Sequence, residues 1–421
     1  MSRKLNVFLC GKKIGVLSED DFLQLSFQYD NNAEALQSCK PLSVHLPVRA
    51  ESYPHAFAYP FFENLTPEGE TLKILTKDHV SGNKVFSILD KFGGDCAGAV
   101  AFYKAMPDDK YIKPKEITSA QVAQIIDNLP LDPLLTGIDN PPRLSLAGAQ
   151  SKFAVYKLNE KYYYSNDNYP TTHIIKISNE RFPNLLNNEL FCMKLAKVIL
   201  SDIPEIELKE VEGRSYLEIT RYDRCLKDQI EPEGNLGLQP LRQIHRIHQE
   251  DFCQALGFVS EKKYQAGGGA KLKDCYEVIS EFSVNRLNDI SRFIEWIIFN
   301  YLIGNTDAHA KNLSLLHDDK IRLAPFYDLL STEVYPEKIV DHKMAMLING
   351  KGKYSSLRTE DFIALFKNLG QNATNMMKVI KEKFVDIVPA SENLRDSLIV
   401  KDASIFDEII KIIKERIKVL F

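Results

Sequence analysis

The sequence lacks the features that mark secreted and membrane-spanning proteins. Its seven cysteines are odd in number, widely spaced and include no C-x-x-C pair. This usage favours a reducing compartment and argues against a disulfide framework or a structural zinc site. The longest apolar runs fall short of the roughly 18 residues that a membrane span needs, and the run at residues 5–10 is too short for a signal-peptide core. We expect a soluble, cytoplasmic protein with no membrane contact. Export to another cell stays open, because the N-terminal sequence would not reveal it.

The sequence also lacks a strong excess of charge of either sign. The 53 Lys and Arg residues against 57 Asp and Glu residues give a net charge of −4. This balance excludes a globally basic nucleic-acid clamp, so any DNA contact must be local or carried by a partner. With 44% hydrophobic and 26% charged residues, disorder, collagen and coiled coil are excluded as the dominant state. Hydrolase and zinc chemistry find little support, since G-x-S-x-G is absent and His245-x-x-His248 is poorly spaced for two ligands.

The length of 421 residues predicts two or three domains, or one large domain with subdivisions. The first hundred residues are mostly strand-like: a hairpin over 5–10 and 14–17, a third strand over 22–29, an aromatic stretch at 57–62 interrupted by prolines, a short helix over 85–91 and a strand over 99–103. A polar, proline-containing stretch at 106–117 marks the first boundary. Residues 1–110 are therefore predicted to form an N-terminal β-rich subdomain.

The remaining chain changes from mixed to helical character. Strands are predicted over 153–157, 173–177, 205–211 and 215–221, with a helix over 185–200 between the second and the third. Helical spacing then dominates over 251–256, 276–282, 291–303, 359–369, 372–384 and 405–420, interrupted by short strands at 313–316 and 321–324. We predict a small lobe over 111–224 and a helical lobe over 225–421. The expected fold class is α+β, with two lobes and a ligand cleft between them.

The most informative polar stretch is residues 304–312, which follows a very apolar helix. Asp, His, Lys and Asn side chains at the end of a buried helix are costly unless they bind something. Asp307 and Asn312 have the D-x-x-x-x-N spacing of a kinase catalytic loop, in which the Asp accepts the proton of the attacking hydroxyl and the Asn binds Mg²⁺. An ordinary turn has the same composition, so the spacing alone leaves both readings open.

A second carboxylate, Asp328, follows the two short strands. A kinase places its main metal ligand at this point. Together with Asn312 and a nucleotide, Asp328 could hold Mg²⁺, which takes few protein ligands and keeps phosphate oxygens and waters. The alternative is that Asp328 only caps the next turn.

The predicted small lobe contains a loop of small residues and a lysine on a strand. Residues 145–152 could admit phosphate oxygens to backbone N–H groups, although a plain hairpin turn fits equally well. Lys176 ends an apolar strand. Seven apolar residues of the following helix lie within about 80° of Glu189 at 100° per residue, and they are Leu185, Leu186, Cys192, Met193, Ala196, Ile199 and Leu200. A carboxylate on that apolar face needs a cation, and Lys176 is the natural partner.

The segment 217–224 joins the two predicted lobes. Its extended backbone could offer N–H and C=O groups to the edge of an adenine ring. Alternatively, Arg221, Asp223 and Arg224 are a solvated surface cluster, which is the commoner outcome for such charge runs.

Taken together, these stretches resemble the HipA family of serine/threonine kinases, the toxins of bacterial toxin–antitoxin pairs. The motifs that carry the resemblance are residues 144–150, 172–176, 246–254, 304–312 and 327–328. They run in the family's order over nearly the whole chain, and the N-terminal region resembles the family's additional subdomain. The resemblance implies a two-lobed, protein-kinase-like fold that uses ATP and Mg²⁺.

The resemblance also implies residue roles. Asp307 would be the catalytic base, and Asn312 and Asp328 the Mg²⁺ ligands, with Tyr327 beside Asp328. Further residues would bind ATP: Lys176 with Glu189, the loop Ala147, Gly148, Ala149, Gln150, Ser151 and Lys152, the hinge Thr220, Arg221 and Tyr222, and His309 and Lys311 beside the transferred phosphate. Ser145 would be an inhibitory autophosphorylation site. Ser151 departs from the family, which often has an acidic residue there, and it could be a second modification site.

Family membership further implies partners. A HipA-like kinase would phosphorylate a protein substrate such as glutamyl-tRNA synthetase or another translation component. It would bind a small helix-turn-helix antitoxin, and DNA contact would occur mainly through that antitoxin. Two other functions stay open from the sequence: a kinase-fold phosphotransferase for a small molecule or lipid, and a non-catalytic corepressor.

Overall fold

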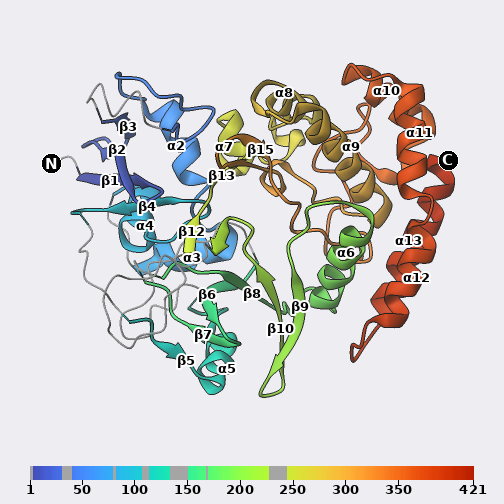
Figure 1. Ribbon diagram of the computed structural model, residues 1–421, viewed down its shortest axis with the longest axis horizontal. Coiled ribbons are helices and arrows are strands. Elements are labelled where there is room, and N and C mark those ends of the chain that lie inside the picture. Colours follow the sequence, from blue (N-terminus) through green and yellow to red (C-terminus); the bar gives the residue numbers. More distant parts are fainter. Residues whose placement is uncertain are drawn as a thin grey trace. The chain divides into compact units, whose positions relative to one another are not determined.

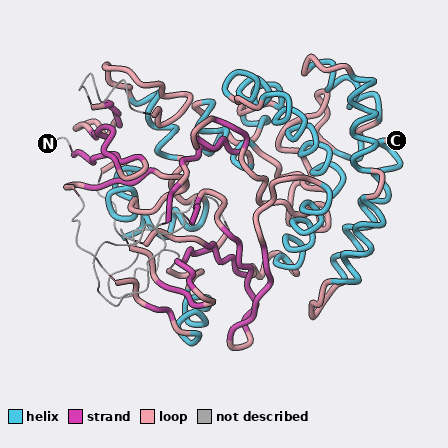
Figure 2. The backbone as a smooth tube through the Cα atoms, viewed as in Figure 1, coloured by secondary structure: helices cyan, strands magenta, loops and turns pink. Residues whose placement is uncertain are grey.

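The computed structural model describes residues 3–30, 40–78, 82–106, 113–132, 150–166, 169–226 and 244–421. The chain divides into two compact units. Unit 1 contains residues 1–175, 220–250 and 316–319, and unit 2 contains residues 176–219, 251–315 and 320–421. Figures 1 and 2 show the elements, and each unit is described separately.

Unit 1 begins with a four-stranded sheet in the order β3-β2-β1-β4. Its strands are β1 (Arg3–Leu9), β2 (Lys12–Glu19), β3 (Leu25–Tyr29) and β4 (Val100–Tyr103). Strands β1 and β2 pair antiparallel, which confirms the predicted hairpin, and the third strand is shorter than the predicted range. Leu5, Phe27 and Phe102 are buried on this sheet and belong to one hydrophobic core.

Among the described residues between β3 and β4, the chain forms three helices: α2 (His55–Glu63), α3 (Gly69–Asp78) and α4 (Lys84–Phe92). Helix α4 confirms the predicted short helix, and the side chain of Asn83 caps its first turn by accepting from two backbone N–H groups. Helix α2 was not predicted. It carries Phe62 into the core, where its ring lies 5.6 Å from that of Phe27.

The rest of unit 1 holds part of a second sheet, in which β5 (Glu116–Ile117), β7 (Lys161–Tyr163), β6 (Lys152–Leu158) and β8 (His173–Ile177) are adjacent in that order. Helix α5 (Ser119–Asn128) follows β5. Strands β11 (Arg224–Leu226) and β12 (Ile244–Arg246) form an antiparallel pair. Strand β13 (His248–Asp251) follows at once.

Unit 2 begins at Lys176 within β8. It continues with α6 (Leu185–Ile199) and the antiparallel pair β9 (Ile206–Val211) and β10 (Arg214–Thr220). The later elements are α7 (Phe252–Leu256), η1 (Ser260–Lys262), η2 (Gln265–Gly267), α8 (Leu272–Phe282), α9 (Arg286–Ile303), η3 (Ala310–Asn312), β14 (Ser314–His317), β15 (Ile321–Leu323), η4 (Tyr354–Ser356), α10 (Thr359–Asn368), α11 (Ala373–Phe384), α12 (Ile387–Ser397) and α13 (Ser404–Leu420).

Helix α9 is the buried centre of unit 2. Trp296, Phe299 and Leu302 on this helix are almost completely buried, and α8 and α13 pack against it. Helix α13 also contacts α6, where Phe191 and Phe406 stack with ring centroids 4.7 Å apart. The C-terminal helix is thus a core helix with a solvated face.

The described residues confirm the mixed α+β class. The chain beyond residue 359 is helical in every described element, whereas the first hundred residues hold both strands (β1, β2 and β3) and helices (α2, α3 and α4) (Figure 2). Within the described part of the chain, no helix is long and apolar enough to cross a membrane. All six described cysteines are free thiols. The division into two kinase lobes stays a prediction.

Candidate active site

Lys176, Glu189 and Asp328 meet in unit 2. Strand β8 carries Lys176, helix α6 carries Glu189, and Asp328 follows the hairpin β14–β15. The Nζ atom of Lys176 lies 2.5 Å from Oε1 of Glu189 and 2.5 Å from Oδ1 of Asp328. The predicted ion pair between Lys176 and Glu189 is therefore present. Asp328 is a second partner of the lysine that the sequence did not indicate.

Two neighbouring carboxylates keep Lys176 charged despite its burial. Lys176 is 6% exposed and Glu189 1% exposed. Burial alone would lower the pKa of Lys176, but the negative charges of Asp328 and Glu189 outweigh it and raise the pKa above its ordinary value. A fixed positive charge on a strand end is suited to contacting phosphate oxygens.

Asp328 lies in a strained but well-anchored segment. Its φ angle of 58° is in the left-handed region that residues other than glycine rarely adopt, and such strain is often found at functional positions. On one side, the backbone N–H of Phe326 donates to the Asp202 carbonyl at 3.0 Å. Beside it, the Tyr327 hydroxyl donates to the Lys311 carbonyl at 2.7 Å. Tyr327 thus connects the Asp328 segment to the loop that contains Asn312.

Arg292 on helix α9 supports the strand that leads to Asp328. Its guanidinium donates to the carbonyls of Leu323 and Ala324, each at 3.0 Å. It also pairs with Asp289 at 3.2 Å and lies 5.1 Å from the centre of the Phe326 ring. The planar, five-donor head of arginine can serve several acceptors at once. The buried helix therefore positions the segment that ends at Asp328.

The loop after α9 brings Asp307 and Asn312 together. The helix ends at Gly304, and the backbone N–H of Asp307 then donates to Oδ1 of Asn305 at 3.1 Å. The Asp307 carbonyl accepts from the His309 backbone N–H at 2.9 Å and from Nδ2 of Asn312 at 3.0 Å. The five-residue spacing therefore forms one hydrogen-bonded loop whose backbone fixes Asp307.

His309 and Lys311 are buried in the same loop, at 6% and 7% exposure. The Nζ atom of Lys311 lies 3.8 Å from a carboxylate oxygen of Asp251, which caps helix α7 by accepting from the Gln254 backbone N–H. The lysine therefore has an acidic neighbour.

The donor set of Asn312 and Asp328 fits Mg²⁺. Asn312 uses its amide nitrogen to bond the Asp307 carbonyl, so Oδ1 is the atom that could bind a metal, and the Asp328 side chain is 37% exposed. One amide oxygen and one carboxylate suit a hard cation whose other ligands are phosphate oxygens and water. Among the described residues, no group of three or more His, Cys, Asp and Glu forms a metal site.

The predicted hinge residues lie in unit 1, and the side chains of Arg221 and Tyr222 make hydrogen bonds there. Thr220 ends strand β10, and the Tyr222 hydroxyl donates to Oε1 of Gln249. The backbone N–H of Arg221 donates to the Thr172 carbonyl at 2.9 Å, so this N–H is committed within the protein. An adenine would have to use the other backbone groups of residues 220–222.

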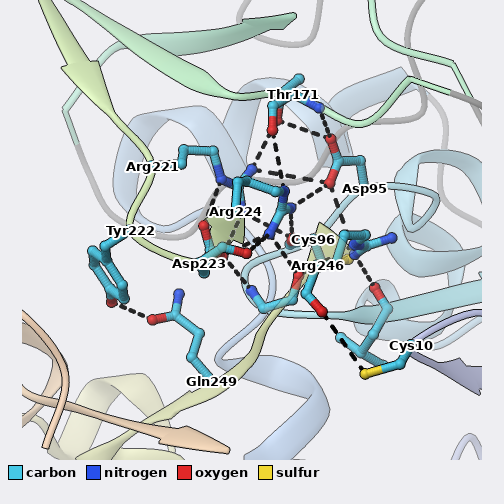
Figure 3. A network of polar contacts seen from close by, with 12 residues as sticks. Cys10, Asp95, Cys96, Thr171, Arg221, Tyr222, Asp223, Arg224, Arg246 and Gln249 are labelled. Carbon is cyan, nitrogen blue, oxygen red and sulfur yellow. Dashed lines mark hydrogen bonds and ion pairs between the residues drawn. The ribbon is translucent and has the colours of Figure 1, made fainter. Parts of the chain in front are cut away.

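The alternative of a solvated charge cluster at Arg221, Asp223 and Arg224 is wrong. Arg221 is 4% exposed and Asp223 3% exposed, and the side chain of Arg224 is 2% exposed. Arg221 holds Asp223 through two hydrogen bonds of 2.9 and 2.7 Å. The cluster is buried because Asp95 supplies a further carboxylate, 2.7 Å from Nη2 of Arg224 (Figure 3).

Part of the predicted phosphate loop lies outside the described residues. Ser145, Ala147, Gly148 and Ala149 belong to that part. Gln150 and Ser151 directly precede strand β6, which Lys152 begins, and all three are partly buried. Residues 150–152 and the hinge belong to unit 1, whereas Lys176, Asp307 and Asp328 belong to unit 2.

The sequence did not indicate Tyr264, whose hydroxyl donates to Oδ1 of Asp307 at 2.7 Å. Tyr264 precedes three consecutive glycines at 267–269. An aromatic residue in a glycine-rich segment is the one local signal that could have drawn attention to it.

Two family models match the chain. The model described as the HipA-like C-terminal domain matches residues 144–390, and the HipA N-terminal domain model matches residues 5–103. The C-terminal match alone covers more than half of the 421 residues.

Known proteins match over most of their length. A Sinorhizobium fredii protein named "Putative kinase Y4mE" is 36% identical over 380 residues, 87% of this chain and 86% of the relative. The serine/threonine-protein kinase toxin HipA of Shewanella oneidensis is 28% identical over 408 residues, 91% of this chain and 89% of that protein. A solved complex of Shewanella oneidensis HipA with HipB and operator DNA matches with a TM-score of 0.81 at 26% identity, covering 98% of this chain and 96% of that chain.

Proposed function

This chain belongs to the HipA family and is a serine/threonine-protein kinase, and we propose that it acts as the toxin of a toxin–antitoxin pair by transferring the γ-phosphoryl group of ATP to a protein hydroxyl. Two contact sets in unit 2 support this. Lys176 is held between Glu189 and Asp328, and Asp307 and Asn312 share one hydrogen-bonded loop. The Tyr327 hydroxyl donates to the Lys311 carbonyl and so connects the loop of Asp307 and Asn312 to the segment that carries Asp328.

In this proposal Asp307 is the catalytic base. The oxygen of the acceptor hydroxyl forms a bond to the γ-phosphorus of ATP, the bond from that phosphorus to the ADP oxygen breaks, and the hydroxyl proton passes to the Asp307 carboxylate. Asn312 and Asp328 would hold Mg²⁺, which when bound supplies positive charge to the phosphate oxygens.

The remaining predicted site residues would orient ATP. Lys176 contacts phosphate oxygens, and Glu189 fixes its ammonium group by the 2.5 Å contact. His309 and Lys311 lie in the loop of the base and could stabilise charge on the transferred phosphoryl group. The loop Ala147 to Lys152 would cover the phosphates, and the backbone of Thr220 to Tyr222 would meet the adenine.

Regulation would act through the same loop. A phosphate on Ser145 carries nearly two negative charges and would repel ATP phosphates from the loop. We therefore propose Ser145 as an inhibitory autophosphorylation site, with Ser151 as a second candidate.

The proposed partners follow from the family. The Shewanella structure contains HipA, HipB and operator DNA, and we propose that this chain likewise binds a small helix-turn-helix antitoxin. Its net charge of −4 agrees with DNA contact made mainly by that partner. The proposed substrate is a translation component such as glutamyl-tRNA synthetase, phosphorylated in the cytoplasm. The three-part organisation at 1–110, 111–224 and 225–421 is proposed on the same basis.

The direct test is phosphotransfer by the purified full chain. Wild-type protein, Asp307→Asn and Asp319→Asn are incubated with labelled ATP, Mg²⁺ and a translation extract, and labelled proteins are identified by mass spectrometry. We expect labelled protein from the wild type and from Asp319→Asn, a matched control at an exposed turn. We expect at least a 100-fold loss with Asp307→Asn. Absence of wild-type transfer contradicts the proposal, and label confined to small molecules or lipids favours the other phosphotransferase.

A further inference from the structure

Tyr264 contacts two side chains of the loop that carries the base. It lies between η1 and η2, and its hydroxyl donates to Oδ1 of Asp307 at 2.7 Å. Its ring meets the His309 ring edge-on, with centroids 5.4 Å apart and planes at 80°. A single tyrosine therefore holds the carboxylate and packs against its neighbour.

Backbone hydrogen bonds hold the two chain segments that make the contact between Tyr264 and Asp307. The backbone N–H of Ala345 donates to the Thr306 carbonyl at 2.9 Å, and the Ala345 carbonyl accepts from the Gln265 backbone N–H at 2.8 Å. Thr306 precedes Asp307, and Gln265 follows Tyr264. One residue thus ties together the two chain segments that present the hydroxyl and the carboxylate.

The turn that carries Tyr264 is closed on itself. The Tyr264 carbonyl accepts from the backbone N–H groups of Gly267 and Gly269 at 3.1 and 3.2 Å. A Cβ atom at position 269 would lie 1.7 Å from the Lys262 carbonyl oxygen, so only glycine allows this close approach. The Gln265 side chain adds a further anchor by accepting from the Leu347 backbone N–H at 2.8 Å.

The carboxylate of Asp307 needs such support. The bonds that fix its backbone leave rotation about χ2, which is a broad torsion for aspartate. The Tyr264 hydroxyl removes this freedom by holding one oxygen, so that the other can accept the proton of a substrate hydroxyl. The ring packs against the His309 ring beside the base, although 37% of Tyr264 is exposed. A ring in this place would hinder the approach of water and so favour transfer to a protein hydroxyl over hydrolysis.

We propose that Tyr264 is a positioning residue that orients the carboxylate of Asp307 and favours a protein hydroxyl over water as the acceptor. This rests on the proposed function of Asp307 as the base. The hydroxyl and the ring have separable effects, so two substitutions test them.

Tyr264→Phe removes the hydrogen bond and keeps the ring. We expect kcat for protein phosphorylation to fall about tenfold, the worth of one hydrogen bond to a charged group in the transition state, with the KM for ATP changed less than about twofold. Tyr264→Ala removes the ring as well. We expect the ratio of ATP hydrolysis to protein phosphorylation to rise severalfold in this variant and to stay unchanged in Tyr264→Phe.

Tyr276→Phe is the matched control, because it removes a phenol hydroxyl that accepts from Gln371; its kcat should stay at the wild-type value. Thermal unfolding checks that each variant is folded. If Tyr264→Phe is unfolded, Gln265→Ala keeps the phenol and loses the anchor to Leu347, and we expect a two- to fivefold fall in its kcat.

Different failures are distinguishable. A wild-type protein without phosphotransfer contradicts the proposed function itself. Normal wild-type transfer with unchanged kcat in folded Tyr264→Phe, or in Gln265→Ala where the former is unfolded, contradicts only the role of Tyr264. An effect confined to the KM for ATP likewise overturns the positioning of the base, and an unchanged hydrolysis ratio in Tyr264→Ala overturns the discrimination against water.

Discussion

Lys176 is a buried cation on which both the stability and the proposed chemistry of the protein depend in our account. Its ammonium lies between Glu189, which is almost fully buried, and Asp328, whose side chain is partly exposed. Burying charges is costly, and a pair repays that cost only when both partners are present. The same lysine is the proposed phosphate contact, so stability and activity should separate when both charges of the buried pair are replaced.

We expect Lys176→Met to lower the free energy of unfolding by about 3–5 kcal/mol, because the buried Glu189 carboxylate loses its lysine. The double variant Lys176→Met, Glu189→Leu should recover most of that stability, since no buried charge is left in the pair. Neither variant should transfer phosphate. Denaturant unfolding and the phosphotransfer assay measure the two effects.

The exposed pair of Lys161 and Glu116, 2.9 Å apart, supplies the control. Lys161→Met should change the free energy of unfolding by less than about 1 kcal/mol. A double variant at 176 and 189 no more stable than the single one would show that the loss comes from packing and not from the unpaired charge.

His248 gives the protein a pH dependence of its own. The residue is buried, and its Nε2–H donates to the Leu42 carbonyl at 2.8 Å. Burial, with the electrostatic effect of nearby His317 second, lowers the pKa of His248 to about 3. Among its other charged neighbours, Arg246 lowers this pKa and Asp223 raises it.

The depressed pKa fixes the sign of the effect. The unfolded chain binds a proton at this histidine near pH 6.5, whereas the folded chain does so only near pH 3. The stabilisation is thus fully present above about pH 6.5 and is lost as the pH falls toward 3, by up to about 1.4 kcal/mol per pH unit. Denaturant unfolding of His248→Gln between pH 6.5 and 4 should show a slope shallower than the wild type by about this amount. A slope equal to that of the exposed control His245→Gln would refute the assignment.

At the scale of elements, several strongly periodic segments were predicted at nearly their true bounds, whereas helices α2, α3, α5 and α12 were missed. Helices α6 and α13 and strand β8 lie almost where the apolar spacing places them. Helix α2 was missed because Pro60 lies within it, and a proline removes one helical hydrogen bond. Helix α12 was missed although Pro389 lies in its first turn, where proline is tolerated.

Contacts within the candidate site also fall into a predictable and an unpredictable group. The pair of Lys176 and Glu189 was predictable because a carboxylate on an apolar helix face requires a cation. The contact of Lys176 with Asp328 joins residues 152 positions apart, and Asp328 lies in an irregular segment. Tyr264 likewise reaches Asp307 from a turn. No local periodicity records such contacts, since they depend on how distant irregular segments fold against one another.

Across the whole chain, the polar network around Asp95 ties together segments that are distant in sequence (Figure 3). Asp95 accepts from Arg224 at 2.7 Å and from the backbone and hydroxyl of Thr171, each at 2.8 Å. Arg246 donates to the carbonyls of Gly94 and Gly98 beside Asp95, and to that of Val100 at the start of β4 at 2.7 Å. The N-terminal segment, the residues just before strand β8 and the predicted hinge therefore share one buried cluster.

Gly98 shows how closely this loop approaches its neighbours. Its backbone N–H donates to a carboxylate oxygen of Asp223 at 2.7 Å, and a Cβ atom there would lie 2.6 Å from the backbone nitrogen of Gln249. Burial alone would raise the pKa of Asp95, but the adjacent arginines, chiefly Arg224 and Arg246, hold it well below its usual range. Asp95 is therefore a permanent negative charge among three arginines. Its removal should disturb the predicted hinge, which two of these arginines adjoin.

We expect Asp95→Asn to lower the free energy of unfolding by about 3–5 kcal/mol, because it leaves buried guanidinium groups with too little negative charge. If the hinge binds adenine, the KM for ATP should rise severalfold with a smaller change in kcat. Denaturant unfolding and ATP-dependent phosphotransfer of the full-length protein measure both effects.

Asp90→Asn is the control. Asp90 forms an ion pair with Lys104, whose side chain is 71% exposed, so its loss should change the free energy of unfolding by less than about 1 kcal/mol. A destabilised Asp95→Asn protein with an unchanged KM for ATP would show that the Asp95 network does not influence nucleotide binding. Stability equal to that of Asp90→Asn would show that the three arginines do not depend on this carboxylate.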